Sequence, residues 1–204
     1  MISFQIPNNE IVNSQVKENA GIERSKLASE VKKINIPLEL VRVHDAFQTS
    51  LPTSASADDL GLVIGTFGTD AMVVQSSDSK AASVTQYGRF TFRLPENYVS
   101  GGAISVAAHA GMKTTISDGT ATIDFQVYAK DEATGLVGSD LVSTPATTIN
   151  SPTAAAKEFV VSPIGLIGGN ELDVRVAIAI TDAATATAVI GRIMKLYMLV
   201  TVQG

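Results

Sequence analysis

The chain has 204 residues and a net charge of -5; 45% of its residues are hydrophobic, but only 5% are aromatic and 17% charged. It contains no cysteine, which excludes disulfide scaffolds, thiolate zinc sites, iron–sulfur clusters and cysteine nucleophiles. Two histidines leave little for a histidine-based metal site or general base. A pI near 5.0 without a Lys/Arg block argues against a nucleic-acid-binding protein.

The N-terminus has neither a basic segment nor an apolar segment of the kind found in signal peptides. The longest apolar stretch, residues 189–202, is interrupted by Arg192 and Lys195 and is shorter than the roughly 20 residues that span a bilayer. We therefore expect a soluble chain with no signal peptide and no membrane-inserted segment.

Charge divides the chain into two parts. Residues 1–45 contain six basic and six acidic residues, whereas residues 46–204 contain nine and fourteen. The second part is also rich in Ala, Gly, Val, Thr and Ser. This shift predicts an N-terminal arm over residues 1–35 and a domain over residues 36–204.

Within the arm, residues 1–20 show no clear period and read as an extended segment. Leu27, Val31 and Ile34 then follow at helical spacing. Ser25 is a suitable N-cap, and Lys32 and Lys33 suit a helix C-terminus. We predict a short helix there, which needs a partner surface because about ten residues are marginally helical alone. That surface is either the protein's own domain or another chain.

The domain has the two-residue period of β-strands. Three segments alternate clearly between apolar and polar residues: 84–94, 120–129 and 171–181. Further strands are expected at 36–44, 60–67, 103–108, 141–144, 157–162 and 186–202. Eight to ten strands separated by turn residues predict an all-β fold, an antiparallel β-sandwich of the jelly-roll type. An immunoglobulin-like sandwich is the alternative, although its Cys–Trp–Cys signature is absent.

The last predicted strand is apolar on both faces, which indicates that both are covered. Ile193, Tyr197 and Leu199 share one of these faces. We expect that face at an oligomer contact. Together with the apolar residues of the arm, the candidate attachment and oligomer contacts are Ile22, Leu27, Val31, Ile34, Ile193, Tyr197 and Leu199.

Residues that could support chemistry have simpler structural interpretations. Asp58 and Asp59 could ligate calcium, but they fit a turn and lack the spacing of an EF-hand. The segment 131–135 reads as a hairpin loop, and His109 as an ordinary polar group at a strand end. No nucleophile elbow, phosphate-binding loop or dinucleotide fingerprint occurs. The sequence therefore predicts no catalytic residue, no cofactor, no metal site and no enzyme activity.

Several short sequence segments resemble segments of tailed-bacteriophage virion proteins. Residues 18–27, Glu-Asn-Ala-Gly-Ile-Glu-Arg-Ser-Lys-Leu, are similar to a phrase in the N-terminal attachment regions of phage fibre and head proteins. In the domain, Leu60-Gly61-Leu62, Ala110-Gly111-Met112 and the segment 118–124 resemble uncharacterised virion proteins. The resemblance implies a jelly-roll capsid decoration or head-fibre protein, often trimeric, and it carries over no catalytic residue.

Taken together, the expected function is that of a non-enzymatic structural virion protein. It would decorate or project from a phage capsid or neck, attach to a capsid, neck or other virion protein through its arm, and form a homotrimer. The alternative is a carbohydrate- or receptor-binding fibre or adhesin module that displays loops such as 49–59 and 76–83. We expect location in the virion, a host surface glycan as a further partner, no nucleic acid and no membrane.

Overall fold

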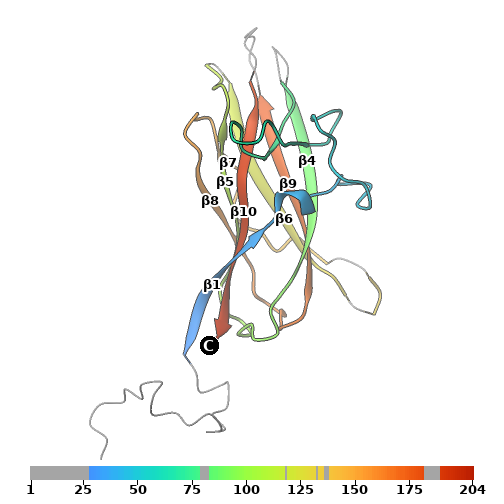
Figure 1. Cartoon of the computed structure of the whole chain (residues 1–204). Coiled ribbons are helices and arrows are strands. Elements are labelled where there is room, and N and C mark those ends of the chain that lie inside the picture. Colours follow the sequence, from blue (N-terminus) through green and yellow to red (C-terminus); the bar gives the residue numbers. More distant parts are fainter. Residues whose placement is uncertain (1–27, 79–82, 118, 132, 136–137, 182–188) are drawn as a thin grey trace, which may run out of the picture.

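The computed structural model describes residues 28–78, 83–117, 119–131, 133–135, 138–181 and 189–204. Figure 1 shows an elongated molecule built from long strands. The strands are β1 (Ser29–Ile36), β2 (Gly61–Val63), β3 (Val73–Gln75), β4 (Val84–Arg93), β5 (Ile104–Met112), β6 (Thr120–Ala129), β7 (Thr147–Thr148), β8 (Ala155–Val161), β9 (Glu171–Thr181) and β10 (Gly191–Gln203). A single 3-10 turn, η3 (Leu38–Leu40), accompanies them in the described residues. Over these ranges, no helix has the length and apolar character of a membrane span.

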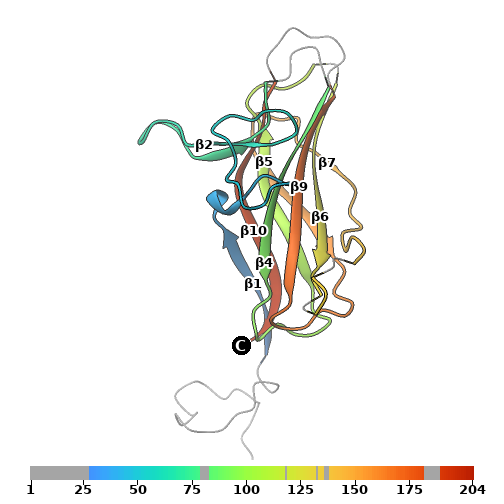
Figure 2. The ribbon, with the colours of Figure 1, turned by 90° about the vertical axis from the view of Figure 1, so that its right-hand side faces the viewer.

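The strands form two antiparallel sheets packed face to face (Figures 1 and 2). Sheet A has the order β2-β3-β10-β5-β8, with β1 also paired to β10, and sheet B has the order β4-β9-β6-β7. Successive strands from β3 to β10 are distributed between the sheets so that two four-stranded layers, β3-β10-β5-β8 and β4-β9-β6-β7, face each other. This is the jelly-roll arrangement. The predicted all-β antiparallel sandwich is confirmed.

The three segments with the clearest alternation form β4, β9 and β6, which are neighbouring strands of sheet B. In each, alternate residues are buried, among them Phe90, Phe125 and Val176. Their registers place apolar residues of all three strands in the same rows. Alternation determined these strands because one face of sheet B meets sheet A and the other meets solvent.

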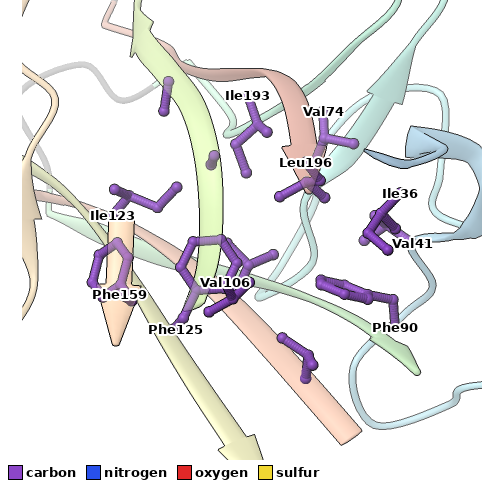
Figure 3. Packing of buried hydrophobic residues seen from close by; sticks show 14 of the residues in the cluster. Ile36, Val41, Val74, Phe90, Val106, Ile123, Phe125, Phe159, Ile193 and Leu196 are labelled. Carbon is purple, nitrogen blue, oxygen red and sulfur yellow. The ribbon is translucent and has the colours of Figure 1, made fainter. Parts of the chain in front are cut away.

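The core lies between the two sheets (Figure 3). Phe125 of β6 meets Phe159 of β8 edge to face, with ring centroids 5.1 Å apart, so these rings join sheet B to sheet A. Gly88 of β4 also faces inward, and a Cβ there would lie 2.6 Å from Cγ1 of Val41. The absence of a side chain at Gly88 lets Val41 enter the core.

The predicted helix at residues 25–34 is wrong for the part described. Residues 29–36 form β1, and each pairs with a residue of β10, from Ser29 opposite Gln203 to Ile36 opposite Leu196. The apolar spacing was misleading because Val31 is 63% exposed rather than part of a buried stripe. A long partner strand overrode local helical preference. The predicted boundary between residues 35 and 36 lies inside β1, so residues 29–35 belong to the sheet.

Other predicted strands differ in extent. Residues 36–44 are not one strand, because β1 ends at Ile36 and η3 follows. The strand predicted at 60–67 is only three residues long, β2. The strand predicted at 141–144 is reduced to one bridge between Val142 and Val161. Some apolar residues of these segments, such as Val41 and Leu60, are buried in the core from irregular backbone, whereas Ile64 and Phe67 are exposed. Periodicity alone does not distinguish such backbone from a strand.

A bulge interrupts β10. Its register against β5 shifts between Ile193 and Lys195. Ile193 faces the core before the shift, and Leu196, Met198 and Val200 face it afterwards; all four are buried. The extra residue at the bulge thus reverses the alternation along the strand. The prediction that Ile193 shares a face with Tyr197 and Leu199 is wrong for this reason.

Candidate functional site

The outer face of sheet B carries an ordered array of polar side chains. Directly opposite residues on the neighbouring strands β4, β9 and β6 form rows across it. The rows are Tyr87–Ala177–Asp124, Arg89–Arg175–Gln126 and Thr91–Asp173–Tyr128. Because paired residues in an antiparallel sheet point to the same side, these side chains share one surface. We call it the sheet B face.

Two guanidinium groups are fixed at the centre of this face. Arg89 donates to both carboxylate oxygens of Asp173, at 2.7 Å from Nε to Oδ1 and through Nη2 to Oδ2. Arg175 donates from Nη2 to Oε1 of Gln126, and its Cζ lies 4.7 Å from the ring centroid of Tyr87. These contacts hold both planar groups in defined orientations.

The ring of His44 lies beside that of Tyr87, with centroids 4.9 Å apart. Tyr87 therefore contacts both His44 and Arg175, and it positions the guanidinium of Arg175. Tyr128, half-buried at the other side of the face, is the second aromatic ring there. Among the described residues, neither a cation nor another aromatic ring stacks on the ring of Tyr128.

Electrostatics at the face are mixed. Asp173 is only 8% exposed and is compensated by Arg89. The hydrogen bond to Asp173 raises the pKa of Arg89, burial lowers it, and the charge of Asp173 raises it further. Burial raises the pKa of Asp124; the backbone N–H of Phe125 lowers it, the charge of Asp140 raises it and Arg175 lowers it. Carboxylates and guanidinium groups thus lie together on one surface.

The face is hollowed along the strands. One hollow of about 280 Å³ is lined by residues that include Tyr87, Asp124 and Arg175. A second, of about 230 Å³, includes Arg89, Tyr128 and Asp173, and the two share Gln126 and Arg175. A third, of about 340 Å³, follows at the ends of the same strands and is lined by Arg93, Lys130, Asp131, Gly135, Gly169 and Glu171. At about 3.4 Å per residue, the distance along β9 from Ala179 to Glu171 is about 27 Å.

Two segments flank the face. Along β4, the chain from Arg42 to Asp59 is joined to the strand by bridges from Arg42 to Arg89 and from Asp59 to Tyr87. Along β6, Oδ1 of Asp140 accepts a hydrogen bond from the Val127 N–H at 3.0 Å, and Ala146 lines the first hollow. The face is therefore bounded on both sides by backbone from distant parts of the sequence.

Asp58 and Asp59 lie in the first of these flanking segments and meet His44. Nδ1 of His44 is 3.2 Å from Oδ1 of Asp59, and Nε2 is 3.5 Å from Oδ2 of Asp58. The three groups could approach a metal ion, since one ligand atom of each lies within 4.8 Å of the others. However, each carboxylate takes a different ring nitrogen, an arrangement that orients the imidazole beside Tyr87. Asp58 and Asp59 therefore lie at a turn, as predicted, and they also help to hold His44 in place at the edge of the sheet B face.

The described residues of the predicted loop at 131–135, which are residue 131 and residues 133–135, form a turn. Oδ1 of Asp131 accepts hydrogen bonds from the N–H of Ala133 at 3.0 Å and of Thr134 at 2.7 Å, and Gly135 has φ +67°. These bonds lower the pKa of Asp131, those from Thr134 most. The carboxylate is engaged in closing the loop.

A larger hollow, of about 610 Å³, lies elsewhere, at the edge of β10 between the end of β1 and Met72. It coincides with the bulge in β10, between Ile193, where pairing with β3 ends, and Leu196, where pairing with β1 begins. Lys33, one of its lining residues, places Nζ 3.7 Å from the centroid of the Tyr197 ring. A gap in strand pairing explains this hollow without a ligand.

The predicted contact residues fall in three places. Ile22 and Leu27 lie outside the described residues. Val31 is exposed on β1, while Ile34 is partly buried and packs on the core. Tyr197 and Leu199 face outward from sheet A.

Ile193 is 0% exposed and belongs to the core (Figure 3), which corrects its prediction as a contact residue. The bulge in β10 is the cause, because it turns this side chain toward sheet B.

The residues of the sheet B face were assigned by the sequence to the polar sides of three strands, but not to a site. A polar outer face is the ordinary condition of an antiparallel sheet. The available signal was the presence of Tyr and Arg among the outward residues of all three strands. Only their register, which brings Arg89, Arg175 and Gln126 into one row, assembles them.

No known protein family matches the sequence. No curated protein matches it either. Among solved structures, the chain is similar to the CBM22-1 xylan-binding domain from Paenibacillus barcinonensis Xyn10C, with 11% identity, a TM-score of 0.43 and coverage of 85% of this chain and 97% of that one.

Two further structures are similar in the same way. The CBM36-1 domain of a multidomain xylanase from the hindgut metagenome of Trinervitermes trinervoides has 9% identity, a TM-score of 0.39, and coverage of 83% and 96%. A putative sugar binding protein from Bacteroides thetaiotaomicron has 8% identity, a TM-score of 0.38, and coverage of 87% and 91%. Similarity this low says nothing about the ligands of this chain.

Proposed function

We propose that this protein is a glycan-binding module that holds a linear, neutral oligosaccharide along the sheet B face. One observation carries the proposal. The row formed by Arg89, Arg175 and Gln126 presents planar donors and acceptors that are already held in place by other side chains.

Preorganised polar groups of this kind suit a polyhydroxylated ligand. Sugar hydroxyl groups donate and accept, so they can bond to guanidinium, amide and carboxylate groups alike. Side chains that are already ordered lose little further entropy on binding. Tyr128 adds a ring whose body is apolar and whose hydroxyl is polar, a combination that fits the alternating C–H and O–H surface of a sugar.

Charge on the face favours a neutral ligand over an anionic one. Arg89 is compensated by Asp173, and Asp124 has its charge close to that of Asp140. A phosphate, sulfate or carboxylate group entering the first hollow would meet Asp124. Repulsion from Asp124 would offset the attraction of Arg175, which lines the same hollow, for nucleic acids and acidic polysaccharides.

Shape favours an internal segment of a chain rather than a single sugar. The first and second hollows lie side by side and share Gln126 and Arg175 as lining residues, and the third hollow follows along the same strands. The flanking segments bound the face at the sides of β4 and β6. A linear ligand would therefore run parallel to the strands.

The virion role predicted from the resemblance is compatible with this proposal and stays a prediction. One contact favours the combination. The N–H of Gly204 donates to the carbonyl of Ala28 at 3.2 Å, so residue 28 and the C-terminus lie together at one end of the sandwich. An arm attached to a particle at that end would leave the sheet B face accessible.

Affinity electrophoresis and a glycan microarray would test the proposed function. The probes are soluble xylan, mixed-linkage glucan, glucomannan, alginate and pectate in gels, and bacterial surface polysaccharides on the array. We expect binding to at least one neutral glycan, and its loss in Arg175→Met. Lys195→Met, which removes one positive charge from the outer face of sheet A, is the matched control and should bind normally.

Absence of binding to every neutral glycan would overturn the proposal. So would preferential binding to alginate and pectate, or equal binding by Arg175→Met and Lys195→Met.

A further inference from the structure

The geometry points to a second interaction surface, the open edge of β1, and we propose that it pairs with the β1 edge of a second copy of this chain. The pairing is antiparallel and two-fold symmetric, with Val31 of one copy opposite Val31 of the other. It joins sheet A of both copies into one continuous sheet. This inference is independent of the glycan-binding proposal.

The edge of β1 is open in the part of the chain that the structure describes. One side of β1 pairs with β10 over all eight residues, and no described strand pairs with the other side. Residues 29–33 are all exposed. Five consecutive exposed residues show that β1 extends beyond the cover of sheet B, as Figure 2 illustrates. An uncovered strand edge is a template for pairing with another strand.

Backbone direction identifies which groups are free. The carbonyl of Ala28 accepts from Gly204, so residue 28 points toward β10. On the far side of β10, the N–H of Thr201 donates to Ala103, so Thr201, the partner of Val31, points away from β1. Antiparallel pairs alternate. The N–H and C=O groups of Ser29, Val31 and Lys33 therefore point to the open edge.

Charge selects one register for self-pairing. With Val31 opposite Val31, Ser29 lies opposite Lys33, and their free backbone groups pair. Glu30 of each copy then lies opposite Lys32 of the other, which gives two favourable cross-strand charge pairs. A shift by two residues brings either Lys32 opposite Lys32 or Glu30 opposite Glu30, and these like charges are unfavourable.

The same register pairs exposed apolar surface. Val31 is 63% exposed, and its side chain lies on the outer face of sheet A beside Thr201, its partner in β10. Two-fold pairing brings the two Val31 side chains together at the symmetry axis. An interface of this type is isologous, so it closes with two copies and leaves no further open β1 edge.

Sedimentation equilibrium of the full chain tests this proposal. We expect a monomer–dimer equilibrium that depends on protein concentration. Glu30→Lys places like charges in both cross-strand pairs and should raise the dimer dissociation constant roughly tenfold or more. Glu158→Lys makes the same change of charge on β8, at the other edge of sheet A, and should leave the constant unchanged.

Charge exchange provides the decisive comparison. The double variant Glu30→Lys/Lys32→Glu should dimerise like the original chain, because the pairs are restored with their charges reversed. An equimolar mixture of Glu30→Lys and tagged Lys32→Glu should form heterodimers that are recovered through the tag. Val31→Pro should also abolish dimers without breaking pairing to β10, since the N–H of Val31 points to the open edge.

A monomer at every concentration, or a trimer, would overturn the proposal. So would equal dissociation constants for Glu30→Lys and Glu158→Lys, or failure of the double variant to restore the dimer. Circular dichroism and thermal melting of each variant identify any variant that fails to fold. If a single variant fails to fold, formation of heterodimers in the charge-exchange mixture decides whether the β1 edges pair.

Discussion

Arg89 and Arg175 lie directly opposite each other on the neighbouring strands β4 and β9. Like charges in this position are unfavourable. Each guanidinium turns to a different partner, Arg89 to Asp173 and Arg175 to Gln126 and Tyr87. The arrangement orders both groups at a cost in electrostatic energy, as expected where side chains are placed for binding rather than for stability.

The pair Arg89–Asp173 should contribute to stability because Asp173 is almost fully buried. We expect Arg89→Met to lower the free energy of unfolding by about 1–3 kcal/mol, since it leaves a buried charge unpaired while Arg89 itself is one-third exposed. Urea unfolding of Arg89→Met, Asp173→Asn and the double variant measures this in a double-mutant cycle. Additive effects of the two substitutions would contradict the prediction.

Asp124 should make stability depend on pH. Its pKa is higher in the folded state than the ordinary value of 3.8, chiefly because of burial. The folded protein therefore holds this proton more tightly than the unfolded chain, and the charged carboxylate costs stability at pH values above the folded pKa. The cost disappears as the pH falls below 3.8.

We accordingly expect Asp124→Asn to raise the melting temperature at pH 7 and to leave it unchanged near pH 3, as measured by calorimetry. An equal rise at both pH values would show that the carboxylate charge is not the cause. Asp78→Asn, which changes an acid outside the sheet B face, is the comparison at both pH values.

Planarity, not charge alone, should matter at position 175. Arg175→Lys retains the positive charge but loses the planar group that lies over Tyr87 and the fork that bonds to Gln126. Affinity for the glycan identified on the array should fall about tenfold, as for loss of a hydrogen bond to a charged group. Isothermal titration measures it. Wild-type affinity in Arg175→Lys would show that only charge is required.

The core should be sensitive where the two sheets meet. Phe125 is 1% exposed and packs against Phe159, so Phe125→Ala should lower the free energy of unfolding by about 3–5 kcal/mol. Phe67 is fully exposed, and Phe67→Ala should change it by no more than about 0.5 kcal/mol. Chemical denaturation of both variants provides the measurement. Similar values for the two would contradict the assignment of Phe125 to the core.

Local alternation determined three neighbouring strands of sheet B. β4, β6 and β9 could be predicted nearly to the residue because one of their faces is buried and the other is solvated, which imposes a period of two on the sequence. The strand count and turn spacing then indicated a sandwich of the jelly-roll type. These features depend on neighbours in the sequence, so the sequence contains them directly.

Only tertiary structure decided the fate of β1, β10 and the sheet B face. Residues 29–34 have helical spacing, but they pair with a strand more than 160 residues later, and that partner determines their conformation. A bulge at one position of β10 reverses which residues face the core. Arg89, Gln126 and Arg175 become one row through strand register, which long-range pairing sets and local spacing does not record.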